Sequence, residues 1–141
     1  MNMSDILTSA LRTQGHKLTR NRIAILSFLS SQDKPMPAEQ ILEHIQAEHQ
    51  DVHKTTIYRE LIFLLEKNFI QEVEFGDGKK RYEIAINRPH HHHVICLNCK
   101  RVENIPLEKE LISQEKLIEE VTKYRLTEHM LEFFGLCENC K

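Results

Sequence analysis

The four cysteines of this 141-residue chain form two short pairs, Cys96-L-N-Cys99 and Cys137-E-N-Cys140. Structural zinc takes four soft ligands in a tetrahedral arrangement, and two loops that each present two thiolates provide them. Two disulfides are the alternative, whereas a redox-active Cys-x-x-Cys would leave the second pair unexplained. No apolar leader occupies residues 1–19, so we expect a cytoplasmic protein whose thiols stay reduced. The spacing therefore predicts a structural Zn²⁺ that ties the last residues to the middle of the chain.

Four consecutive histidines, residues 90–93, run directly into the first cysteine pair. If residues 91–96 form a strand, successive side chains point to opposite faces. His90 and His92 then share one face, and His91 and His93 share the other. Because histidine is the commonest metal ligand, the run can contribute to two metal sites, one on each face. An expression tag would be terminal, which this run is not, and a solvated polar strand end is the competing interpretation.

The composition restricts the function classes. The formal net charge of −2 argues against indiscriminate coating of nucleic acid, but not against a local DNA-reading face. No apolar run approaches the length of a membrane span, so no membrane partner is expected. The sequence has no His-Glu-x-x-His motif, no Gly-rich phosphate loop and no nucleophile arrangement, so we do not expect an enzyme. A zinc-storage or interaction module is a competing class.

The hydrophobic spacing predicts helices over residues 4–14, from residue 19, from residue 37 and over residues 54–67. Residues 69–75 then alternate like a strand, Gly76-Asp77-Gly78 is typical of a hairpin turn, and residues 81–86 return as the partner strand. The second to fourth of these helices, followed by a two-stranded hairpin, have the order of a winged helix-turn-helix. We expect an α+β protein with a DNA-binding domain over residues 1–87 and a hinge at residues 87–89.

The second expected domain covers residues 88–141 and combines strands near residues 91–96, 101–105 and 127–136 with a helix over residues 107–124. A three-stranded sheet with one helix has a small core. Domains of this size usually gain stability from a metal ion or from an oligomer interface, and we expect both here.

In a helix-turn-helix, residues near the start of the second helix reach into the major groove. That helix begins here with K-T-T-I-Y-R-E-L at residue 54. Hydroxyl and guanidinium groups at such positions can contact phosphates or base edges. Any one of them alone would equally suit a solvated surface, but together they predict one DNA-reading face. The candidate DNA contacts are Lys17, Arg22, Thr55, Thr56, Tyr58 and Arg59.

Taken together, these motifs resemble the ferric uptake regulator (Fur) family of bacterial metal-sensing repressors. The resemblance covers nearly the whole chain and rests on G-H-K-L-T-R-N-R (15–22), T-T-I-Y-R-E-L (55–61), E-F-G-D-G-K-K-R-Y-E (74–83), residues 90–99, and L-T-E-H with G-L-C-E-N-C (126–140). It implies a homodimer that binds a double-stranded DNA operator, with a structural zinc on the four cysteines and a second metal that controls binding. Lys17 matches the family's minor-groove lysine, and Tyr58 and Arg59 match its recognition-helix pair.

The resemblance implies a regulatory site at the hinge, formed by His91, His93 and Glu83. Two further family positions align with Pro35 and Asn104, which are poor ligands, although Glu103 stands next to the second of them. Ala85 lies where zinc-sensing members often have a cysteine. The hinge site is therefore expected to be incomplete, completed by water, or built differently.

A second regulatory site is implied at His90, His92 and His129, with an acid on the helix of the second domain. We expect Glu110 to be this acid, with Glu108 as the alternative. Three imidazoles and a carboxylate favour Zn²⁺ over Fe²⁺, as does the likeness of F-L-L-E-K-N-F-I to the zinc uptake branch, whereas Glu83 resembles the iron branch. A peroxide sensor of the same family is disfavoured, because that branch usually has Asp at the position of Glu83.

Overall fold

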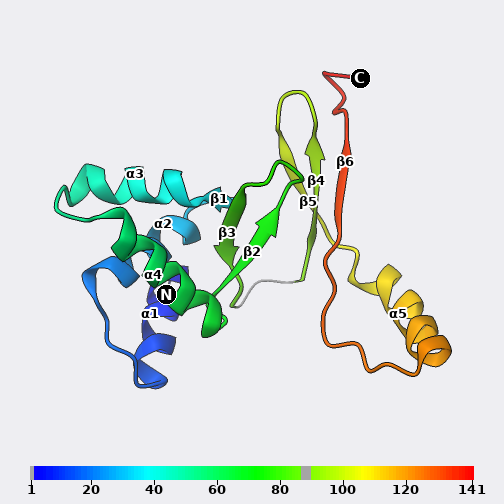
Figure 1. Ribbon diagram of the computed structural model, residues 1–141, viewed down its shortest axis with the longest axis horizontal. Coiled ribbons are helices and arrows are strands. Elements are labelled where there is room, and N and C mark those ends of the chain that lie inside the picture. Colours follow the sequence, from blue (N-terminus) through cyan, green and yellow to red (C-terminus); the bar gives the residue numbers. More distant parts are fainter. Residues whose placement is uncertain (1, 87–89) are drawn as a thin grey trace. The chain divides into compact units, whose positions relative to one another are not determined.

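The computed structural model describes residues 2–86 and 90–141, except for the side chain of Glu108. The chain divides into two units, Met1–Arg88 and Pro89–Lys141, and each combines helices with one small sheet (Figure 1). The predicted α+β class is confirmed. The predicted hinge at residues 87–89 lies outside the described residues, so the exact domain boundary stays a prediction.

Four helices dominate the first unit, and their ends follow from local capping. Asn2 and Asp5 form a reciprocal capping box at the start of the first helix, and the Thr19 hydroxyl accepts the Arg22 backbone N–H at the start of the second. Gly15 has φ 81°, a left-handed conformation that lets the chain turn between them. The helices are α1 (Met3–Thr13), α2 (Arg20–Ser30), α3 (Ala38–Glu48) and α4 (Lys54–Glu66).

A three-stranded antiparallel sheet completes this unit, in the order β1 (Met36–Pro37), β3 (Lys80–Ile84), β2 (Ile70–Glu74). The sequence predicts only the β2–β3 hairpin, whose turn contains Gly76 and Gly78 at positive φ. The short β1 was not predicted. It forms because a residue that precedes proline favours an extended backbone, so Met36 can pair with Tyr82 along the free edge of β3.

The core of the first unit joins all four helices to the sheet. Ile57, Leu61 and Leu64 bury one face of α4 against this core, which leaves Thr55 and Arg59 on the solvent side of the helix. A recognition helix needs this division between an anchored face and a readable face. The largest side chains of the core are all fully buried: Leu7, Leu11, Ile25, Leu26, Leu29, Ile41, Ile45, Ile57, Leu61, Leu64, Phe69 and Ile84.

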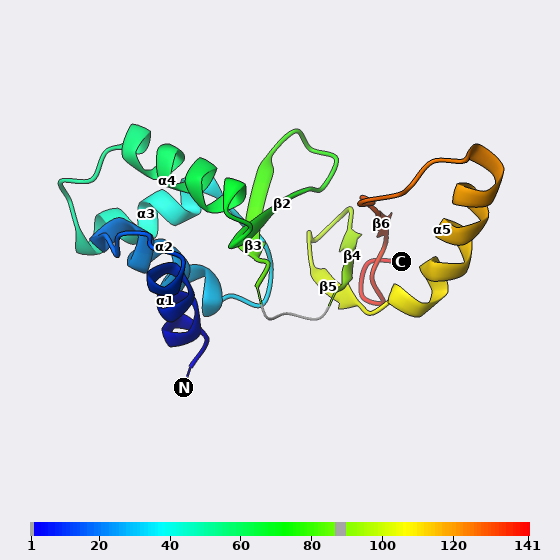
Figure 2. The ribbon, with the colours of Figure 1, turned by 90° about the horizontal axis from the view of Figure 1, so that it is seen from below.

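The second unit consists of β4 (His92–Cys96), β5 (Val102–Ile105), α5 (Glu108–Thr122) and β6 (Glu132–Gly135), with strand order β5-β4-β6. The β4–β5 pair is antiparallel, whereas β4 and β6 run parallel with Cys96 opposite Gly135. Because parallel strands end at the same edge of a sheet, the residues after β4 and after β6 emerge side by side there (Figure 2). These residues carry the two cysteine pairs.

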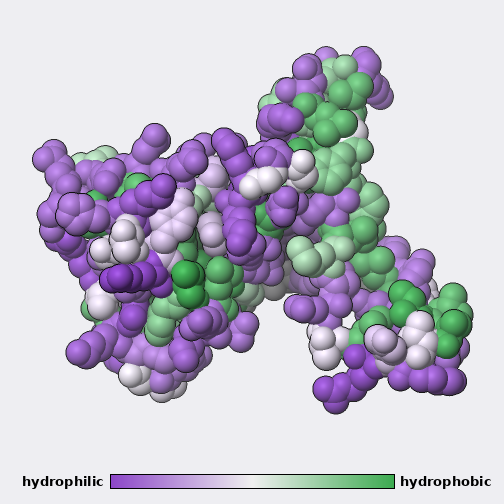
Figure 3. Space-filling view, in the orientation of Figure 1, coloured by the Kyte–Doolittle hydropathy of each residue, from purple (hydrophilic) through white to green (hydrophobic). Residues whose placement is uncertain are grey.

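Many apolar side chains of the second unit face solvent. Val121 and Leu117 on α5 are 73% and 59% exposed, and Tyr124 just after this helix is 74% exposed. Figure 3 shows apolar surface over α5 and over the sheet of this unit. Phe133 and Phe134 on β6 are also exposed. This unit therefore has a small core, as predicted, together with an unusual amount of uncovered apolar surface.

Among the described residues, no helix combines the length and the apolar composition that crossing a membrane requires.

Candidate metal centres and nucleic-acid interface

The two cysteine pairs meet at one edge of the second unit's sheet. One sulfur from each of the four residues lies within 4.8 Å of all the others, and all four thiols are free. The Cys99 and Cys137 sulfurs are 3.7 Å apart. Four sulfurs bound at about 2.3 Å to one tetrahedral zinc would lie about 3.8 Å from each other, so the spacing fits Zn²⁺. It does not fit a disulfide, whose sulfurs are about 2 Å apart.

Hydrogen-bond donors surround these sulfurs and give them unequal acidities. The backbone N–H of Cys137 donates to Sγ of Cys96 over 3.4 Å and is the main reason that the pKa of Cys96 falls to about 6. The Asn98 amide donates to Cys140 and lowers the pKa of that thiol, but the neighbouring cysteine sulfurs, Cys137 first, raise it to about 11. Four thiolates so close together need a cation between them, because like charges oppose ionisation of the last thiol.

Three imidazoles form a second cluster on one face of β4. The Nε2 atom of His90 lies 3.1 Å from that of His92 and 3.0 Å from that of His129, and the latter two are 3.1 Å apart. A metal ion about 2.0–2.1 Å from each nitrogen fits over a triangle with such edges. This grouping of His90 with His92 follows the alternation expected for a strand.

The other ring nitrogens of this cluster are held by acceptors. Nδ1 of His92 donates to the Leu131 carbonyl over 2.9 Å, and Nδ1 of His129 donates to Oε1 of Glu115 over 2.5 Å. In the neutral rings this leaves both Nε2 atoms unprotonated and facing each other. Two lone pairs at 3.1 Å repel unless a cation lies between them, and metal-bound histidines typically have such partners on the second nitrogen.

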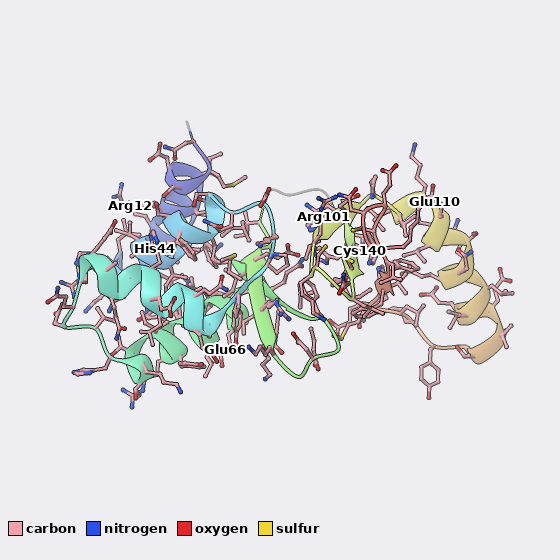
Figure 4. All side chains as sticks on the ribbon, turned by 90° about the horizontal axis from the view of Figure 1, so that it is seen from above. Arg12, His44, Glu66, Arg101, Glu110 and Cys140 are labelled. Atoms are coloured by element: carbon pink, nitrogen blue, oxygen red, sulfur yellow. The ribbon has the colours of Figure 1, made fainter. Side chains whose placement is uncertain are left out.

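The structure does not bring Glu110 to these imidazoles, although the sequence analysis names it as the acidic ligand. Glu110 is exposed in the first turn of α5 (Figure 4), and the carboxylate that reaches His129 belongs to Glu115. Five residues at about 100° each place these two side chains about 140° apart around the helix. The alternative, Glu108, has a side chain that lies outside the description.

Glu115→Gln should weaken metal binding at the three-histidine cluster, because the ring of His129 loses its charged partner. We expect the dissociation constant to rise on the order of 10- to 100-fold, as is usual for such partners. Isothermal titration of protein whose cysteine site stays filled measures this constant. Glu110→Gln is the matched control and should change little. A large effect of Glu110→Gln with none of Glu115→Gln would instead make Glu110 the ligand.

The remaining histidines of the run lie together on the other face of β4. The rings of His91 and His93 meet edge to face, with centroids 4.9 Å apart. Oε2 of Glu132 accepts from the backbone N–H of His93 over 3.1 Å and from its Nδ1 over 2.9 Å. Glu132 reaches His93 because the two residues are paired across the parallel β4–β6 ladder. The contact of Glu132 with His93 was not predicted from the sequence, since this register joins segments almost forty residues apart.

The predicted hinge acid, Glu83, belongs to the first unit. It lies on β3, is only 2% exposed, and accepts a hydrogen bond of 2.6 Å from the Gln71 side-chain amide. In the second unit, Asn104 is opposite His93 across the β4–β5 ladder, and Glu103 is opposite Val94. Both are exposed. Because successive strand residues point to opposite faces, Glu103 shares the face of Val94, and only Asn104 shares the face of His93.

The predicted DNA-reading residues divide into two groups. Thr55 and Arg59 on α4 are exposed, as is Lys17 before α2, whereas Thr56 and Tyr58 are half-buried. Tyr58 packs against the core on one side. A partly anchored tyrosine presents its hydroxyl in a restricted direction, which suits recognition of a groove edge.

Arg22 is different, because its guanidinium is occupied within the protein. Nε donates to Oε2 of Glu60 over 2.7 Å, Nη1 donates to the Lys17 carbonyl over 3.0 Å, and the guanidinium lies 3.8 Å from the centre of the Phe63 ring. Both charged side chains of the ion pair are more than four-fifths covered. These contacts fix α2 against α4, so the structure gives Arg22 a role in positioning α4.

Arg22→Lys should lower the free energy of unfolding of the first unit by roughly 1–3 kcal/mol, because lysine keeps the charge but loses the stacked guanidinium and the Nε bond. Denaturant unfolding followed by circular dichroism measures the change. Arg59→Lys on the exposed face of α4 is the matched control and should leave stability unchanged. An unchanged stability in Arg22→Lys, together with weakened DNA binding, would favour a direct DNA contact instead.

A winged helix-turn-helix unit followed by a small unit with clustered cysteines and histidines defines a class of protein, the metal-sensing transcriptional regulators. The family model described as the ferric uptake regulator family matches residues 13–134, and the chain belongs to this family. Proteins of this family regulate transcription and are not enzymes.

Two characterised relatives and one solved structure illustrate the likeness. The chain is 34% identical to the ferric uptake regulation protein of Campylobacter jejuni over 92% of its own length and 83% of the relative. It is 30% identical to the peroxide-responsive repressor PerR of Staphylococcus saprophyticus, over 99% of its length and 91% of the relative. The ferric uptake regulator of Helicobacter pylori, whose structure reveals three functional metal-binding sites, superposes with a TM-score of 0.77 at 26% identity, covering 98% and 91% of the two chains.

Proposed function

We propose that this protein is a cytoplasmic, homodimeric repressor whose binding to a double-stranded DNA operator is switched by a regulatory divalent metal. The observation that carries the proposal is the triangle of Nε2 atoms from His90, His92 and His129. Two of these rings are locked by acceptors on Nδ1, so the cluster is prepared for a cation. The four-cysteine cluster would hold a structural Zn²⁺ that keeps the second unit folded.

A further part of the proposal concerns the hinge histidines. From the family resemblance, His91, His93 and Glu83 would form a regulatory site with ligands from both units. The bond between His93 and Glu132 supports a ligand role, because it directs the proton of the neutral ring to Nδ1 and leaves Nε2 as the coordinating nitrogen. A metal held by both units would restrict their relative motion, so metal and DNA would favour the same conformer.

Dimer formation is supported by the exposed apolar residues of the second unit. An obligate homodimer interface is more apolar than ordinary surface, and Leu117, Val121 and Phe134 offer such a surface. A dimer would also present two α4 helices to two half-sites of one operator. Sedimentation of the zinc-loaded protein at micromolar concentration should therefore give twice the monomer mass of 16.7 kDa.

Zn²⁺ is favoured over Fe²⁺ as the regulatory ion. Three imidazoles are borderline ligands that suit zinc, and the Glu115 carboxylate accepts from a ring nitrogen of His129. Operator binding titrated separately with Zn²⁺, Fe²⁺ and Mn²⁺ tests this choice. Activation at the lowest free concentration by Fe²⁺ would identify an iron sensor instead.

A test of the DNA-regulatory role begins with a duplex selected by the metal-loaded protein from a random-sequence pool. Binding to this duplex should weaken steeply as salt rises, because lysine and arginine release counterions from the phosphates. A zinc-storage or interaction module should select no sequence and show no such dependence. Selection of a palindromic duplex would support the regulator, and failure to select any duplex would contradict it.

A peroxide sensor is a second candidate, favoured by the 30% identity to the peroxide-responsive repressor over nearly the whole chain. Iron-loaded protein exposed briefly to hydrogen peroxide and then returned to fresh Fe²⁺ distinguishes the two. A peroxide sensor would lose operator binding permanently, whereas a metal sensor should recover it when the metal is restored.

A further inference from the structure

A pocket of the first unit lies between the wing and the start of α3. Its walls come from the β2–β3 turn, from α4 and from the first residues of α3, with Lys79, Lys80, Tyr58 and Tyr82 among them. Side chains from the recognition helix and from the wing therefore face the same small space. Two lysines and two tyrosines line this pocket with a single carboxylate, Glu39, so potential donors outnumber acceptors, as in an anion site.

Tyr82 is the most informative member of this pocket. The residue is only 5% exposed, and no described residue hydrogen-bonds its hydroxyl. One fully covered side-chain polar atom of the described residues lacks a hydrogen-bond partner, Oδ1 of Asn21, and Asn21 does not line this pocket. The Tyr82 side chain lines the pocket, and its hydroxyl has no hydrogen-bond partner among the described residues. A buried hydroxyl normally has a partner, so this donor is available for a ligand.

The charge around the pocket is mainly positive. Lys79 is exposed and forms no ion pair with a described residue, whereas Lys80 has a 3.6 Å pairing with Glu72. The start of α3 adds a partial positive charge, because the peptide dipoles of a helix align. Its N-cap, Pro37, makes no side-chain cap, so backbone N–H groups of the first turn remain available to a ligand. Glu39 also lines the pocket and opposes an anion, which gives the site a carboxylate whose removal can be tested.

The hydroxyl of Tyr82 stays a donor over the whole working range of pH. Burial is the main cause that raises the pKa of Tyr82, and the charges of Glu72 and Tyr58 raise it further. The group is therefore protonated wherever DNA is bound and can donate to a phosphate oxygen.

We propose that this pocket is a phosphate seat, in which Lys79, the Tyr82 hydroxyl and the start of α3 bind one phosphate of the operator backbone. This inference rests on the proposed DNA-regulatory function and adds to it a backbone contact made by the Tyr82 hydroxyl and the start of α3 together with a lysine of the wing. A backbone contact carries no sequence information, but it fixes the register of α4 in the major groove. Because this pocket is lined both by the wing and by Tyr58 of α4, a phosphate bound there would set how deeply α4 enters the major groove.

Equilibrium binding to the selected duplex, measured at several salt concentrations, tests the seat. Lys79→Gln should reduce the slope of log Kd against log salt by about one per protomer. Tyr82→Phe should weaken binding on the order of tenfold without changing that slope, because only a neutral donor is lost. Glu39→Gln should tighten binding. Lys34→Gln, an exposed lysine outside the pocket, is the matched control and should keep the wild-type slope.

Duplexes with a single neutral methylphosphonate at each position in turn locate the phosphate. One position per half-site should lose affinity in the wild type and lose much less in Lys79→Gln, while all other positions lose equally in both proteins. Equal losses at every position, or wild-type binding by both Lys79→Gln and Tyr82→Phe with unchanged unfolding temperatures, would overturn the seat and leave the regulator intact. Tight binding of inorganic phosphate without DNA would overturn the assignment to the DNA backbone. A wild-type protein that binds no duplex would overturn both proposals.

Discussion

Replacing Cys96 by serine should remove the structural zinc and unfold the second unit while the first unit stays folded. Cys96 is 4% exposed and is bonded to the backbone of Cys137, so it is the most deeply placed of the four thiols. Structural zinc contributes roughly 10–16 kcal/mol of apparent binding free energy, which is comparable to or larger than the whole stability of a small domain. The second unit has too little buried apolar surface to compensate, because most of its large apolar side chains are exposed.

Metal analysis and sedimentation measure this result. After dialysis has removed the exchangeable regulatory metal, we expect zinc to fall from about one ion per protomer to none, and the dimer to dissociate. The helical signal of the first unit should persist, since its core is separate. Leu97→Ser in the same turn is a suitable control, because Leu97 is 54% exposed and has no thiol. Full zinc content and an intact dimer in Cys96→Ser would show that the cysteine cluster is not the structural centre.

Replacing His93 by alanine should leave the structural zinc and the fold but abolish the dependence of operator binding on metal. His93 has its Nδ1 held by Glu132 and its ring against His91, so its removal takes away both a ligand and the ordering of its neighbour. A shift from a mostly open to a mostly closed state needs roughly 5.5 kcal/mol of differential binding, and loss of one ligand forfeits a large part of it.

Fluorescence anisotropy with the selected duplex, with and without the regulatory metal, reports the effect. The wild type should bind on the order of 100-fold more tightly with metal, and His93→Ala should show the same weak affinity in both conditions. His44→Ala removes an exposed imidazole that is stacked on Phe28, far from the histidine run in sequence, and should retain the switch. If His93→Ala kept a full metal response, His93 would not be a regulatory ligand.

The sequence predicts the order of the elements and the chemistry of the clusters well. Capping residues, glycines in the turns and the change from helical to alternating spacing are local features, and these placed the helices and most strands to within a few residues, although the strand expected over residues 127–136 begins only at Glu132. The meeting of the two cysteine pairs was also predictable, because two Cys-x-x-Cys pairs in a chain with no other cysteine favour one shared site, and the free thiols of the structure rule out the alternative of two disulfides.

What the sequence could not predict depends on how distant segments align. Glu132 reaches His93 only through the register of the parallel β4–β6 pair, and Glu115 reaches His129 only through the rotation of α5. The expectation of Glu110 came from counting residues along the chain, which ignores that rotation. In the same way, the residue type and position of Arg22 suit DNA, but Glu60 and Phe63, about forty residues away, hold its guanidinium.

The most direct test of the whole account is a thermodynamic cycle on zinc-loaded dimer, in which the four-cysteine site stays filled throughout. The factor by which regulatory metal tightens operator binding is measured by anisotropy, and the factor by which the operator tightens metal binding is measured by competition with a chelator. The account predicts that the two factors are equal and on the order of 100, because metal and DNA select the same conformer. Equal operator affinity with and without regulatory metal, in protein that retains its structural zinc, would contradict it.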